Sequence, residues 1–64
     1  MLINRNVMVA GRRTSMRLEP EFWAALDEIA VKRGVKRNRV IEAVKLDGSL
    51  TSAVRVAVLE EFRK

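Results

Sequence analysis

The sequence predicts a small, mainly α-helical domain that contains one short β-strand and assembles as a homodimer. Two observations lead to this fold class. A segment at about 12–18 alternates between apolar and basic side chains, and three later segments carry apolar residues at helical spacing. Nothing later in the chain clearly supplies a partner for the strand. We therefore expect the same strand of a second copy to pair with it.

The predicted strand has two different faces. Small or apolar side chains lie along the face that can be buried: Thr14, Met16 and Leu18. The other face offers two guanidinium groups and a hydroxyl: Arg13, Ser15 and Arg17. This second face is either a binding surface or a solvated polar face on the ribbon.

Residues 1–11 are expected to form an N-terminal arm, and the domain itself is expected over 12–64. The arm either extends the strand or lies free, with a turn permitted at Gly11. Arg5 and Arg12 are possible arm contacts to a polyanion, and a loose terminus is an equally good interpretation.

Three helices are expected, over about 20–33, 37–46 and 50–63. Pro20 suits the first position of the first helix, and Gly34 suits the position after its last turn. The second helix has Lys36 or Asn38 near its N-cap. Helical stripes and the strand together predict this core: Met16, Leu18, Phe22, Leu26, Ile29, Val40, Ile41, Val44, Leu50, Val54, Val58 and Phe62.

Size and composition favour assembly over a monomer. The chain has only 64 residues, and 48% of them are apolar. A monomer of this size buries only about 60% of its unfolded surface, so much of the apolar surface would stay exposed without a partner. The chain contains neither Cys nor His, so disulfides and zinc cannot stabilise it.

The same composition argues against an enzyme. Without His, Cys, a glycine-rich phosphate loop or an obvious pair of acids, we expect no catalytic residues, no metal and no cofactor. No apolar run approaches a membrane span, and the first ten residues are too short and too polar for a secretory signal. We therefore expect a cytoplasmic protein with no membrane partner.

The positive charge is concentrated at two places. The net charge is +5, and nine of the thirteen basic residues lie within 1–18 and 32–39, two segments without a single acid. A charge distribution of this kind favours a polyanion as partner. At the start of the second helix the basic or polar side chains are Lys36, Arg37, Asn38 and Arg39. They suit phosphate contacts, or they form an exposed basic turn that helps only solubility.

The order of strand and helices, with the motif GRRTSMRLEPEFW at 11–23 and LTSAVRVAVL at 50–59, resembles the ribbon-helix-helix (Arc/MetJ/CopG-type) family of DNA-binding proteins. It is most similar to a bacterial subfamily with an added C-terminal helix. The resemblance implies an intertwined homodimer in which one strand from each copy forms a two-stranded antiparallel intermolecular ribbon, and this ribbon enters the major groove of double-stranded DNA. It also implies base contacts from Arg13, Ser15 and Arg17, and phosphate contacts from the start of the second helix. Where the family commonly has a Ser or Thr cap on that helix, this chain has Lys36.

Two further side chains are better explained by structure than by ligand binding. Trp23 lies beside the apolar stripe and is expected to pack against the arm or a partner chain. Arg55 is expected at the surface or the dimer rim, pairing with an acid.

The function expected from these residues is sequence-specific DNA binding by a homodimer that acts as a transcriptional regulator or repressor, with or without further assembly of dimers on DNA. An alternative is a dimeric adaptor, or an antitoxin component, that uses the same fold to bind protein.

Overall fold

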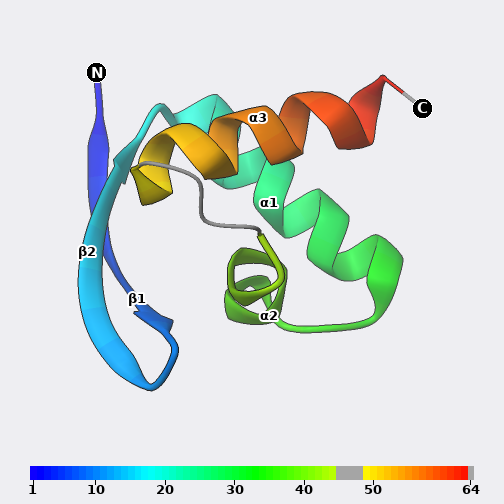
Figure 1. Cartoon of the computed structure of the whole chain (residues 1–64). Coiled ribbons are helices and arrows are strands. Elements are labelled where there is room, and N and C mark those ends of the chain that lie inside the picture. Colours follow the sequence, from blue (N-terminus) through cyan, green and yellow to red (C-terminus); the bar gives the residue numbers. More distant parts are fainter. Residues whose placement is uncertain (45–48, 64) are drawn as a thin grey trace.

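The computed structural model describes residues 1–44 and 49–63 as a β-hairpin followed by three helices (Figure 1). The strands are β1 (Ile3–Val9) and β2 (Arg12–Leu18). The helices are α1 (Pro20–Arg33), α2 (Arg37–Glu42) and α3 (Leu50–Phe62). The hairpin stands along one side of the helices, and its turn extends beyond them (Figure 1).

The two strands pair antiparallel within the chain, from Ile3 opposite Leu18 to Val9 opposite Arg12. Ala10 and Gly11 form the loop with φ angles of 53° and 77°. Two successive positive φ angles are what a type I′ hairpin turn requires. The expectation of a single strand preceded by an arm is therefore wrong, because residues 3–9 form a strand that packs Val7 into the core.

This pairing also changes the partner of β2. The sequence predicted that a second copy would supply it, whereas in the structure β1 occupies one edge of β2. The reason is the alternation of Ile3, Val7 and Val9 along β1, which gives this strand an apolar face of its own toward the helices.

The helix ends follow local chemistry. The N–H of Gly34, at φ 69°, bonds to the carbonyl oxygens of Ala30 and Val31 and ends α1. The hydroxyl of Ser49 accepts a hydrogen bond from the N–H of Ser52 at 3.2 Å and caps α3. At α2 the N-cap is Lys36, which makes no side-chain cap bond. α2 is shorter than expected, and positions 45–46 of the expected helix lie outside the described residues.

The core joins the hairpin to all three helices. Its most completely buried members are Met16, Leu18, Leu26, Ile41 and Val54. Ile29, Val40 and Val58 are buried as expected, and Val7, Trp23 and Ala30 are buried in addition. Phe22, Val44 and Leu50 are partly buried.

Two residues expected to be buried are exposed. Phe62 is 54% exposed because the inward position on the last turn of α3 falls to Glu61, seven residues after Val54. Thr14 is exposed, as is Arg12 on the same face nearer the turn, whereas Met16 and Leu18, farther from the turn, are buried. None of the described helices has the length and apolar character needed to cross a lipid bilayer.

Candidate nucleic-acid interface

The outer face of β2 carries the three side chains that the sequence singled out. Arg13, Ser15 and Arg17 are all exposed and alternate with Met16 and Leu18, which are buried against the helices. No acid occurs in the first 18 residues of the chain. The face is therefore a surface of positive charge and hydrogen-bond donors.

β1 adds three side chains to this face that the sequence reasoning missed. Directly opposed residues of an antiparallel pair share a face, and the register places Asn4 opposite Arg17, Asn6 opposite Ser15 and Met8 opposite Arg13. Both asparagines are exposed. The signal that could have found them is the alternation of Asn4 and Asn6 with Ile3 and Val7.

The hydrogen bonds of Asn38 show which backbone groups of β1 point away from β2. Its Oδ1 accepts a hydrogen bond from the backbone N–H of Met8 at 2.8 Å, and its Nδ2 donates to the Met8 carbonyl oxygen at 2.9 Å. The backbone of Met8 is therefore directed away from β2. Since this direction alternates along an antiparallel pair, Asn4 and Asn6 also point their backbone groups away from β2.

By the same alternation, Arg13, Ser15 and Arg17 direct their N–H and C=O groups away from β1, along the outer edge of β2. Within residues 1–44 and 49–63, no backbone hydrogen bond beyond the hairpin reaches this edge. The edge of β1 is capped by Asn38 at Met8, whereas the edge of β2 is left open for a further strand.

The four residues at the start of α2 divide into two pairs. Arg37 Nη1 lies 3.2 Å from Asp27 Oδ1, and its guanidinium lies 5.0 Å from the centre of the Trp23 ring. Asn38 is committed to Met8. Lys36 and Arg39 are both exposed. Of the four side chains predicted to contact phosphate, Arg37 and Asn38 therefore also make contacts within the protein.

The strand face and the start of α2 meet at one place. A surface hollow is lined by Asn6, Val7, Met8, Arg13 and Asn38. It brings a side chain from each of the two segments singled out in the sequence, Arg13 and Asn38, to the same part of the surface.

The two possible arm contacts lie on the other side of the hairpin. Arg5 is opposite Met16, and its guanidinium lies 5.6 Å from the centre of the Trp23 ring. Arg12 is exposed and opposite Val9, next to the turn. Neither residue belongs to the face that carries Arg13 and Arg17.

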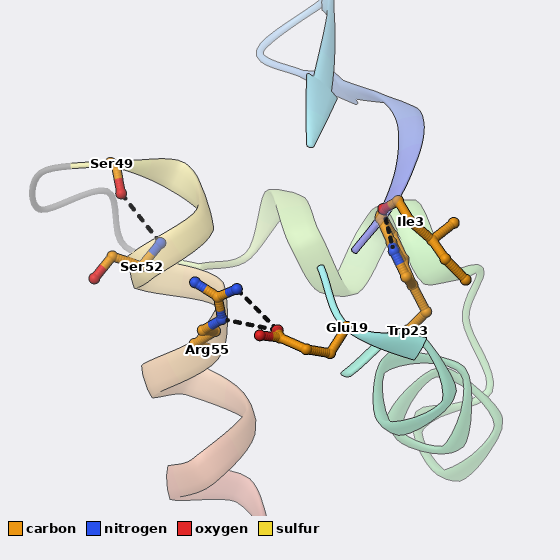
Figure 2. Close-up of polar contacts among 6 residues, drawn as sticks. All are labelled: Ile3, Glu19, Trp23, Ser49, Ser52 and Arg55. Atoms are coloured by element: carbon orange, nitrogen blue, oxygen red, sulfur yellow. Dashed lines mark hydrogen bonds and ion pairs between the residues drawn. The ribbon is translucent and has the colours of Figure 1, made fainter. Parts of the chain in front are cut away.

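Trp23 packs inside the protein, as its position beside the apolar stripe led us to expect. It is 3% exposed, and its Nε1–H donates to the carbonyl oxygen of Ile3 at 2.9 Å (Figure 2). The indole therefore ties the start of β1 to α1.

Arg55 pairs with an acid, also as expected. Its Nη2 and Nε donate to Glu19 Oε1 at 2.8 and 3.2 Å (Figure 2). The hydrogen bond from Arg55 holds the pKa of the Glu19 carboxyl below its usual range. This contact joins α3 to the junction between β2 and α1.

The chemistry available on the ribbon is recognition of an anion or of base edges. Guanidinium groups bind phosphate or guanine in a bidentate manner, and asparagine amides pair with adenine or donate to phosphate. The residues that the structure describes contain no group of three or more His, Cys, Asp or Glu side chains that could hold a metal ion.

A known protein family matches this chain. The model of the ribbon-helix-helix domain matches residues 2–62, almost the whole chain, so the chain belongs to this family. Proteins of this family are generally DNA-binding regulators. Searches of curated proteins and of solved structures found no match.

Proposed function

We propose that this member of the ribbon-helix-helix family binds double-stranded DNA in a sequence-specific manner as a homodimer and regulates transcription, as a repressor, in the bacterial cytoplasm. The observation that carries the proposal is the exposed outer face of β2, where Arg13, Ser15 and Arg17 lie side by side in a segment without acids. Family membership supports it, because the family generally binds DNA as dimers.

The side chains on this face suit base edges in the major groove. An arginine reaches O6 and N7 of guanine with two parallel hydrogen bonds, and each such contact contributes about 1–3 kcal/mol of discrimination. A serine hydroxyl both donates and accepts, so it discriminates less. Arg13 and Arg17 are therefore proposed as the main readers of sequence, with Ser15 between them.

The open edge of β2 is the proposed site for the second copy. If two β2 strands pair antiparallel about Ser15, Arg13 of one chain lies opposite Arg17 of the other, and both outer faces point the same way. A two-stranded centre of this kind fits the major groove. The facing arginines repel each other in the free dimer, and DNA would relieve that repulsion.

Phosphate contacts are proposed for the start of α2. Lys36 and Arg39 are exposed and can reach the DNA backbone without losing a contact in the protein. Arg37 and Asn38 remain candidates, with their bonds to Asp27 and Met8 fixing their positions. Arg5 and Arg12 lie on the helix-facing side of the hairpin. They contribute to the positive electrostatic potential that attracts DNA.

The test is the salt dependence of binding to random duplex DNA, with the mass of the protein measured in the same buffer. A dimer that contacts several phosphates should lose affinity steeply with salt, with a slope of about −0.9 per phosphate in a plot of log affinity against log salt. Arg13→Ala should weaken binding, and the control variant Arg63→Ala, which removes the same charge from the end of α3, should not. Failure of the wild-type protein to bind any duplex at low salt would refute the proposal.

Protein association is a second candidate, favoured by the outer surface of α3. Val56, Leu59 and Phe62 are each more than half exposed, and contiguous exposed apolar surface is typical of a protein interface. A protein that bound no DNA but captured a partner through these residues, and lost it in Leu59→Lys, would be an adaptor.

A further inference from the structure

Asn4 and Asn6 are two amide side chains on the outer face of β1 that no structural role explains. They are exposed, and among the described residues neither side chain makes a hydrogen bond within the protein. By contrast, Asn38, the third asparagine of the chain, has both of its polar side-chain atoms hydrogen-bonded to Met8. The contrast is informative, because asparagine is unfavourable inside a strand unless its amide has a use.

The position of β1 in the assembly decides what these amides can reach. Neighbouring strands of a sheet lie about 4.8 Å apart. With two β2 strands paired at the centre, each β2 lies about 2.4 Å from the dyad axis and each β1 lies about 7 Å from it. The major groove is about 12 Å wide, so its walls lie about 6 Å from its centre. The side chains of β2 therefore face the bases, whereas those of β1 face the sugar-phosphate walls.

We infer that Asn4 and Asn6 donate hydrogen bonds from Nδ2 to phosphate oxygens on the two walls of the groove. The inference rests on the proposed function. In this arrangement β1 positions β2 in the groove. Asn6 lies across from Ser15, and Asn4 lies across from Arg17. Contacts from these amides to phosphate therefore fix the depth and register at which the arginines of β2 meet the bases. The hairpin thus supplies reading and positioning from one chain.

Three variants test the inference against a duplex selected for tight binding and a scrambled duplex of the same length. Asn4→Ala and Asn6→Ala remove the amides from exposed positions, where no fold contact is lost. Asn6→Lys replaces the amide with a cation that also suits phosphate. Val31→Lys is the matched control for charge, since Val31 is 82% exposed and belongs to the last turn of α1. Figure 1 shows this end of α1 far from the hairpin.

The alanine variants should bind both duplexes about tenfold more weakly, with the ratio of the two affinities and the salt slope unchanged, because a neutral amide releases no counterions. Asn6→Lys should recover the affinity and steepen the slope by about 1.8 for the dimer, since each copy gains one charged phosphate contact. Val31→Lys should leave the slope as it is.

A change in the ratio of the two affinities in Asn6→Ala would show that β1 reads bases and would overturn the inference while leaving DNA binding intact. Unchanged affinity in both alanine variants would overturn it as well. If the wild-type protein binds neither duplex, the proposed function itself fails and the inference falls with it.

Discussion

Asn38 is the residue that most directly links the two segments singled out in the sequence. Its amide bonds to both backbone groups of Met8, 30 residues earlier in the chain, at 2.8 and 2.9 Å. It behaves as a short replacement for a neighbouring strand, because it satisfies one donor and one acceptor at the edge of β1. This contact caps the β1 edge at Met8, whereas among the described residues no such contact caps the outer edge of β2.

Replacement of Asn38 should loosen β1 in a manner that depends on the substituent. Asn38→Ala removes both hydrogen bonds and should lower the free energy of unfolding by about 1–2 kcal/mol. Asn38→Asp keeps the acceptor for the Met8 N–H and loses the donor to the carbonyl oxygen. Hydrogen exchange should therefore show lost protection of the Met8 amide in the alanine variant and retained protection in the aspartate variant. Equal protection in the wild-type protein and in Asn38→Ala would contradict this role.

The Glu19–Arg55 pair makes stability depend on pH. The hydrogen bond from Arg55 lowers the pKa of Glu19 in the folded protein, so the unfolded chain takes up a proton first as the pH falls. The contribution of the pair is complete above the ordinary glutamate pKa and is lost as the pH drops through the lower folded value. Denaturation curves from pH 7 to pH 3 should show the wild-type protein losing its advantage over Glu19→Gln across that window. A constant difference between the two proteins would contradict the assignment.

Among the described helices, α2 is the shortest, and no side-chain hydrogen bond caps its N-terminus. It spans only Arg37–Glu42, and its N-cap residue is Lys36. α3, by contrast, has the cap bond from Ser49. A cation at a helix N-terminus also opposes the helix dipole. Lys36, at the start of α2, is therefore unfavourable for the stability of the helix but well suited to bind a phosphate group.

Lys36→Ser should separate these two properties. A serine cap should raise the free energy of unfolding by about 0.5–2 kcal/mol, measured by urea denaturation. The same variant should weaken binding to every duplex alike and reduce the salt slope, because a phosphate contact is removed. Gain of stability with unchanged DNA affinity would exclude Lys36 from the interface.

For the whole molecule, the sequence predicted the three helices and the exposed face of β2 because their periodicity is strong. It failed on β1, because the hairpin turn is Ala10–Gly11 rather than Asn-Gly and gives no clear turn signal. Without β1, the asparagines of the outer face and the bond of Asn38 to Met8 could not be foreseen. The exposure of Phe62 was not predicted, because the spacing of apolar residues along a helix does not show at which residue the helix leaves the core.

The proposed binding mode assigns base recognition to the outer face of β2 and contacts with the DNA backbone to α2. The decisive measurement is the ratio of affinities for a selected and a scrambled duplex, in the wild-type protein, Arg17→Ala and Arg39→Ala. Arg17→Ala should lower this ratio at least about fivefold, as the loss of a bidentate contact requires, and Arg39→Ala should weaken both duplexes equally. An unchanged ratio in Arg17→Ala would contradict the account.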